Sequence, residues 1–160
     1  MKRIVVEPEK CTGCRDCELV CSIKQTGEFN PARAQIKAVY FPEEMVNVPL
    51  TCLHCQVPLC MEACPTEAFS RDQATDAVVV AQDKCIGCYM CITACPVGAI
   101  RTVPDQGVIS KCELCQGEPA CVEICSAGVL SYQEIEELSI ARSRNAAAEL
   151  KKVIKGVDFR

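Results

Sequence analysis

The chain consists of short apolar runs separated by polar stretches that contain glycine or proline. The longest apolar run, residues 77–81, is far shorter than the roughly 20 residues needed to cross a bilayer. Short runs rich in β-branched side chains favour strands. We predict five of them, at residues 4–6, 35–41, 77–80, 107–109 and 129–132.

A longer polar pattern follows the last predicted strand. Acidic residues gather at its start and lysines near its end, an order that suits the macrodipole of a helix. Gly156 offers a stop. We therefore predict a C-terminal helix within residues 133–160, after a main domain over residues 1–132.

Internal repetition is the strongest feature of the sequence. All sixteen cysteines fall into four quartets, with two residues between the first two cysteines and three between the last two. The third quartet reads C-x2-C-x2-C-x3-C-P, and the first differs from it in having serine in place of proline. The quartets are Cys11, Cys14, Cys17 and Cys21; Cys52, Cys55, Cys60 and Cys64; Cys85, Cys88, Cys91 and Cys95; and Cys112, Cys115, Cys121 and Cys125.

Composition limits the classes that this chain can belong to. Aromatic residues make up 4% of the chain and tryptophan is absent. The apolar core would therefore be thin unless something besides side chains fills it. The net charge of −4 and the lack of a basic stripe argue against nucleic-acid binding. The first residues lack the apolar core of a signal peptide, so we expect a cytoplasmic protein without membrane insertion, whose thiols bind metal.

The third quartet matches the bacterial ferredoxin run for [4Fe–4S] ligation, in which the fourth cysteine serves the other cluster of a pair. Three closely spaced thiolates can wrap three corners of a cubane within one loop. Four quartets thus predict four [4Fe–4S] clusters, which would fill the thin core. Sixteen thiolates on four oxidised cores would bring the formal charge from −4 to about −12.

Zinc is the main alternative. Zinc sites pair two C-x2-C knuckles across a spacer of roughly 15–20 residues. Each quartet here spans only 11 to 14 residues, a spacing that would crowd one tetrahedron. A disulfide scaffold is the remaining alternative, and it conflicts with the expected location.

The quartets as a set resemble the four-cluster, ferredoxin-like electron-transfer subunits, the type of the iron–sulfur subunit of dimethyl sulfoxide reductase. The resemblance covers residues 5–132. Residues 51–66 are similar to that family's second motif, and residues 111–121 to its fourth. Residues 10–33 look most like the small subunits of tungsten aldehyde oxidoreductase-type enzymes.

The resemblance implies an α+β fold with two ferredoxin-like lobes and nested pairing of the quartets, first with fourth and second with third. The inner lobe would span about residues 48–103, and the outer lobe about 1–47 with 104–132. Tandem pairing, first with second and third with fourth, is the alternative. Nested pairing implies clusters on Cys11, Cys14, Cys17 and Cys125; on Cys112, Cys115, Cys121 and Cys21; on Cys52, Cys55, Cys60 and Cys95; and on Cys85, Cys88, Cys91 and Cys64.

The same resemblance implies a function. We expect a non-catalytic subunit that relays electrons between a large catalytic oxidoreductase subunit, of the tungsten- or molybdenum-pterin type, and another carrier. That carrier would be a flavin- or NAD-linked subunit or a ferredoxin. No catalytic residue is expected. A freely diffusing polyferredoxin and a maturation factor for a redox enzyme are the alternatives.

Two further features stand beside the quartets. We expect His54, the single histidine, to pack in its loop beside Cys55, with tuning of a cluster as the alternative. A lysine precedes the first cysteine of three quartets, namely Lys10, Lys84 and Lys111. We expect these lysines to be solvated, with compensation of cluster charge as the alternative.

Protein purified without oxygen should contain about sixteen iron and sixteen acid-labile sulfide per chain, four of each per cubane. Metal analysis and a sulfide assay measure both. Stoichiometric zinc with little sulfide would contradict the iron–sulfur interpretation.

Overall fold

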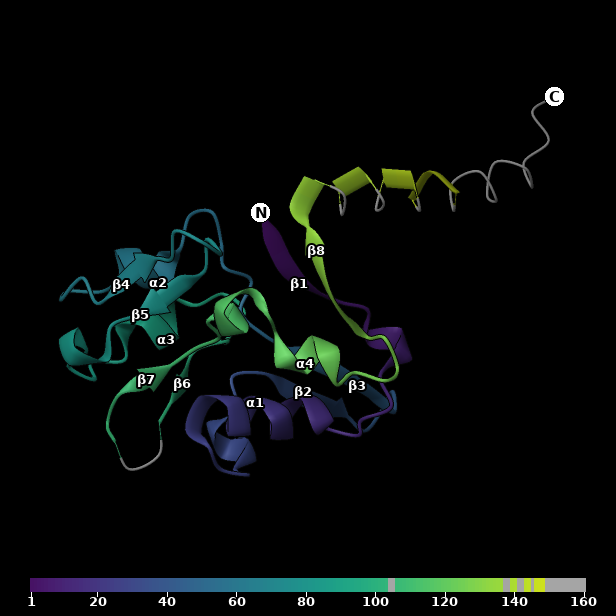
Figure 1. Cartoon of the computed structure of the whole chain (residues 1–160), viewed down its shortest axis with the longest axis horizontal. Coiled ribbons are helices and arrows are strands. Elements are labelled where there is room, and N and C mark those ends of the chain that lie inside the picture. The colour runs from purple at the N-terminus through teal and green to yellow at the C-terminus, as the bar shows by residue number, and fades with distance from the viewer. Residues whose placement is uncertain (104–105, 137–138, 141–142, 145, 149–160) are drawn as a thin grey trace.

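The computed structural model describes residues 1–103, 106–136, 139–140, 143–144 and 146–148, and it mixes short helices with short antiparallel sheets, as predicted (Figure 1). The strands are β1 (Lys2–Val6), β2 (Lys37–Phe41), β3 (Val46–Leu50), β4 (Phe69–Arg71), β5 (Val78–Val80), β6 (Arg101–Thr102), β7 (Ile109–Ser110) and β8 (Leu130–Glu134). The α-helices are α1 (Asp16–Thr26), α2 (Leu59–Glu62), α3 (Met90–Ala94) and α4 (Ala120–Glu123). Single 3-10 turns lie at Pro8–Lys10, Pro31–Arg33, Gln82–Lys84 and Leu114–Gly117.

Each sheet has two antiparallel strands. β2 pairs with β3, β4 with β5 and β6 with β7, all as hairpins, whereas β1 pairs with β8 from the other end of the chain. All five predicted strands overlap with observed ones, but β3, β4 and β6 were not predicted. β3 contains Pro49, which cannot donate to a ladder, and β4 and β6 are too short to show an alternating pattern.

The elements form two groups. In Figure 1, α1, α4, β1 to β3 and β8 lie together, and α2, α3 and β4 to β7 form the second group beside them. α1 packs against α4, and α2 packs against α3. The helices that follow the first and fourth cysteine loops are thus neighbours, as are those that follow the second and third.

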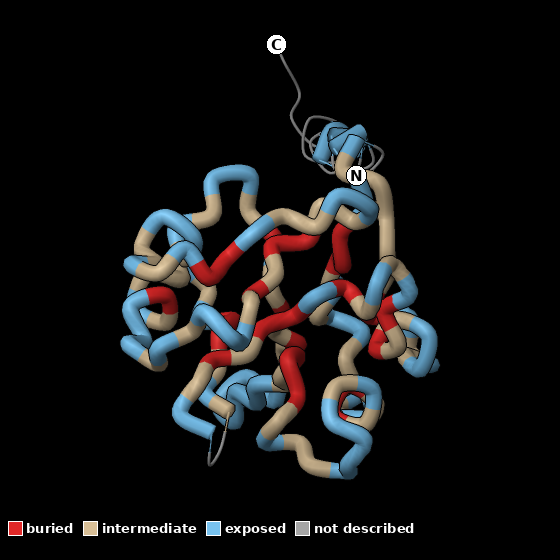
Figure 2. Tube along the Cα trace, turned by 60° about the vertical axis from the view of Figure 1, so that its left-hand side comes forward, coloured by how far each residue is buried: buried red, intermediate tan, exposed pale blue. Residues whose placement is uncertain are grey.

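Each group has its own apolar core, and cysteines belong to both. The first core is built around Ile4, Ile36, Leu114 and Leu130, together with Cys21, Cys112 and Cys121. The second is built around Phe69, Val78, Ile100 and Ile109, together with Cys91. Figure 2 shows the buried segments running through the middle of the molecule, with exposed loops around them.

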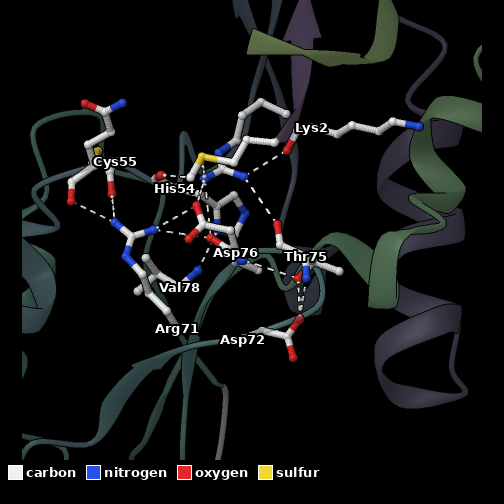
Figure 3. A network of polar contacts seen from close by, with 12 residues as sticks. Lys2, His54, Cys55, Arg71, Asp72, Thr75, Asp76 and Val78 are labelled. Carbon is white, nitrogen blue, oxygen red and sulfur yellow. Dashed lines mark hydrogen bonds and ion pairs between the residues drawn. The ribbon is translucent and has the colours of Figure 1, made fainter. Parts of the chain in front are cut away.

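A buried arginine joins the two groups. Arg3 on β1, with 7% of its surface exposed, forms an ion pair with Asp76 and donates to the carbonyl oxygens of Thr75 (3.4 Å) and His54 (3.4 Å) (Figure 3). Arg71 contacts the same carboxylate at 3.1 Å and also donates to Cys55 O. Burial opposes ionisation of Asp76, but the two guanidinium groups hold its pKa below the ordinary value.

The C-terminal segment follows β8. Its described residues from 135 to 148 are helical, whereas Gln133 and Glu134, which the predicted helix included, belong to β8. Much of residues 133–160 lies outside the described part. Among the described residues, none of the helices combines the length and apolarity that a membrane span requires.

Candidate metal centres

The four cysteine loops share a backbone turn. The residue two positions after the first cysteine of each quartet adopts a positive φ, in the left-handed region. These residues are Gly13 (φ 74°), His54 (47°), Gly87 (67°) and Leu114 (59°). The four loops therefore share this turn, although only two of them use glycine there.

Backbone amides point at several of the sulfur atoms. An N–H to sulfur hydrogen bond favours the thiolate form and stabilises negative charge on that sulfur. The pairs are Gln35 N with Cys21 Sγ (3.2 Å), His54 N with Cys52 Sγ (3.4 Å), Ala68 N with Cys64 Sγ (3.3 Å), Ala99 N with Cys95 Sγ (3.4 Å) and Leu114 N with Cys112 Sγ (3.4 Å). The fourth cysteines of the first three quartets are all among these acceptors.

Twelve cysteines line three cavities, four to each cavity, and in each case one cysteine comes from a distant quartet. We name these groups by their members. Set A is Cys11, Cys14, Cys17 and Cys125. Set B is Cys21, Cys112, Cys115 and Cys121. Set D is Cys64, Cys85, Cys88 and Cys91.

The remaining cysteines are Cys52, Cys55, Cys60 and Cys95, which we name set C. Burial raises the pKa of the Cys60 thiol, the Lys111 ammonium lowers it, and the neighbouring thiols of Cys52 and Cys95 raise it. The second quartet therefore lies close to the fourth cysteine of the third quartet.

The sets follow one another in space. Burial raises the pKa of Cys121 in set B, and Cys17 of set A is among the thiols that add to the rise. Burial likewise raises the pKa of Cys112 to about 11, with a contribution from Cys52 of set C. The pKa of Cys91 in set D is raised to about 11, first by burial and also by Cys60. These electrostatic influences place set A near set B, set B near set C and set C near set D.

Each of the two terminal sets contains one exposed thiol. Cys14 in set A and Cys88 in set D are exposed, while the other fourteen cysteines, all within the described residues, are buried or half-buried. In set B, three of the four cysteines are buried. A row of sites with one exposed thiol at each end is suited to passing charge through the molecule.

The chemistry of the donors fits iron–sulfur clusters. Burial raises the pKa of Cys17, Cys91 and Cys112 to about 11, so these thiols are neutral at pH 7 until a metal displaces the proton. In the described chain, no three histidine, cysteine or acidic side chains come together tightly enough to hold a single metal ion. The cysteines of sets A, B and D surround cavities instead.

Comparison with known proteins decides the family. Residues 43–135 match the model of the 4Fe-4S dicluster domain, and residues 8–27 match a 4Fe-4S binding domain. The chain belongs to the 4Fe-4S dicluster domain family. The predicted [4Fe–4S] chemistry is thereby confirmed.

Relatives and one solved structure extend this result. The chain is 45% identical over 123 residues to the aliphatic sulfonate oxidoreductase, polyferredoxin-like subunit of Pyrococcus furiosus, covering 76% of this chain and 70% of that one. It is 31% identical to the thiosulfate reductase electron transfer subunit PhsB of Salmonella typhi, covering 85% and 77%. A chain of the active site complex BamBC of benzoyl coenzyme A reductase superposes with a TM-score of 0.51 at 25% identity, covering 97% of each chain. The predicted likeness to electron-transfer subunits of oxidoreductases is confirmed.

The histidine and the three lysines near the quartets differ in burial. His54 is 2% exposed, and its Nδ1 accepts a hydrogen bond from Val78 N (3.0 Å), so it packs between the loops as expected. Burial and then the charge of Lys111 lower its pKa to about 3, which keeps the ring neutral. Lys10 and Lys84 are exposed, as expected. The prediction was wrong for Lys111, which is 1% exposed because β5 and the fourth quartet close over it.

Gly87→Ala should reduce iron binding at set D. A Cβ at this position would lie 2.1 Å from the carbonyl oxygen of Gly107, so the loop between Cys85 and Cys88 and the turn at Gly107 must separate, at a cost of about 1–3 kcal/mol. Gly27→Ala is the matched control, because φ is also positive there (74°) but no atom lies within 4 Å of the added carbon. Iron content and thermal unfolding measure both. Equal effects of the two substitutions would contradict the predicted clash.

Proposed function

We propose that the protein is an electron-transfer subunit that holds four [4Fe–4S] clusters on sets A to D and relays electrons between a catalytic oxidoreductase subunit and a second carrier. The observation that carries this proposal is that twelve cysteines line three cavities as sets A, B and D, each with one cysteine from another quartet, and that the thiols of Cys14 and Cys88 are exposed. Each cluster supplies one-electron chemistry when bound.

The side chains of this protein would hold, orient and shield the clusters. The thiols of each set provide four ligands, and the backbone amides that point at Cys21, Cys52, Cys64, Cys95 and Cys112 stabilise negative charge on sulfur. Three cysteines of set B belong to the first core, and Cys52, Cys60 and Cys95 of set C pack against the two cores. Entry and exit would take place at sets A and D.

Several contacts support the nested ligand sets. Cys125 lies at the cavity of the first quartet, Cys21 at that of the fourth, and Cys64 at that of the third. The packing of α1 on α4 and of α2 on α3 agrees with the same pairing. Tandem pairing would instead need the first quartet to share cysteines with the second.

The catalytic partner is proposed from the relatives. Their names place them in oxidoreductases that act on sulfonates, thiosulfate or benzoyl-CoA. For this chain we infer a large catalytic subunit of the tungsten- or molybdenum-pterin type in the cytoplasm, because residues 10–33 resemble the small subunits of tungsten aldehyde oxidoreductase-type enzymes. The second carrier would be a flavin- or NAD-linked subunit or a ferredoxin.

A fragment of residues 51–110 should bind about eight iron by itself. It contains sets C and D complete, and it keeps the pairing of β6 with β7 and the core residue Ile109. Iron and sulfide analysis after anaerobic reconstitution measures the loading.

The fragment with Cys64→Ser is the matched control and should lose about half of the iron, because Cys64 belongs to set D. Tandem pairing gives a different result, since Cys64 would then serve a site outside the fragment. Poor loading of the parent fragment, or no change on removing Cys64, would count against nested sets.

The full chain should restore electron flow from its catalytic partner to a soluble acceptor, while showing no substrate turnover alone. Stopped-flow absorbance with the reconstituted complex measures the transfer. If docking is electrostatic, added salt should slow the bimolecular step, because the loaded chain carries a formal charge of about −12. Substrate-dependent dye reduction by this chain alone would contradict the proposal.

A further inference from the structure

Lys111 is a buried cation without an acidic partner. It is among the largest fully buried side chains, and the ion pairs found among the described residues do not include it. Its ammonium donates hydrogen bonds to Val78 O and to Cys112 O (3.1 Å). A buried ammonium with only neutral partners carries a large desolvation penalty unless negative charge lies nearby.

The position of Lys111 is the junction of sets B and C. It directly precedes Cys112 of set B and bonds to that residue's carbonyl. Its other partner, Val78, donates through its own amide to His54, which lies in the loop between Cys52 and Cys55 of set C. Burial raises the pKa of both Cys112 and Cys60, and the charge of Lys111 opposes that rise in both thiols.

The neighbouring charges do not cancel this cation. His54 is neutral, since burial and the nearby cations lower its pKa to about 3. Arg3 and Arg71 also face His54, but they share the carboxylate of Asp76. The negative charge that Lys111 lacks in the protein would therefore come from the thiolates and clusters of sets B and C.

We propose that Lys111 is a fixed internal charge that outweighs the effect of burial at the two interior clusters, those on sets B and C, so that their reduction potentials lie above those of the terminal clusters on sets A and D. The inference rests on the proposed four-cluster function. Each four-thiolate cluster carries a formal charge of about −2 that becomes about −3 on reduction. Burial disfavours the added charge, and a nearby ammonium favours it. Electrons would then rest in the middle of the path.

The test is a redox titration of the loaded full-length protein, followed by electron paramagnetic resonance. In Lys111→Met, two of the four midpoint potentials should fall, so that the reduced-to-oxidised ratio of two clusters drops about tenfold at a fixed potential, about 59 mV for one electron. Lys111→Gln removes the charge but keeps a hydrogen-bond donor, and it should give the same fall. Lys84→Met, at the equivalent but exposed position, should change no ratio more than about twofold.

The outcomes separate this inference from the proposed function. Unchanged potentials in a Lys111 variant that keeps sixteen iron would overturn the role of Lys111 alone. A fall in Lys111→Met that is absent in Lys111→Gln would also overturn it, because the hydrogen bond rather than the charge would be responsible. Fewer than four clusters in the unmodified protein would instead contradict the proposed function.

A second measurement does not depend on the folding of the Lys111 variants. Cys14→Ser and Cys88→Ser alter ligands of the terminal sets A and D. Each should shift one of the two lower midpoint potentials and leave the higher pair in place. A shift in the higher pair would show that the interior clusters are the low-potential ones, and Lys111 would not set the order.

Discussion

Cysteine thiols from distant segments must meet around common cavities, and this requirement organises the whole molecule. Cys17 and Cys125 line one cavity although more than 100 residues separate them. β1 and β8 must therefore pair across the length of the chain, and α1 must pack on α4. The sheets themselves are small, so metal binding would supply much of the folding stability that a larger apolar core supplies in other domains.

Charge in this protein is distributed unevenly between surface and interior. The chain is acidic overall, with a net charge of −4, yet Arg3 and Lys111 are among its buried residues. Arg3 is matched by Asp76 and fixes β1 to the loop that carries the second quartet. Lys111 donates to the carbonyl oxygens of Val78 and Cys112. Its charge also acts on the thiols of Cys112 and Cys60.

The sequence was sufficient for the metal chemistry because cysteine spacing records local geometry. The turns at Gly13 and Gly87 form within single cysteine loops. The burial of Lys111 could not be predicted in this way. Lys10 and Lys84 occupy the same place in their quartets, and the difference arises from β5, which packs over Lys111 and is distant in sequence. β3, with its proline, and the two-residue β6 likewise depend on their partner strands rather than on their own pattern.

The residue at the shared turn differs between the terminal sets, A and D, and the interior sets, B and C. At the ends, sets A and D, the left-handed position is glycine and contributes no side chain to the core. In the middle, it is occupied by His54 and Leu114, which are 2% and 0% exposed and pack between segments of both groups of elements. An end loop can therefore open without withdrawing the side chain at this position from either core. Opening an interior loop instead moves a buried side chain out of its contacts with segments that are distant in sequence.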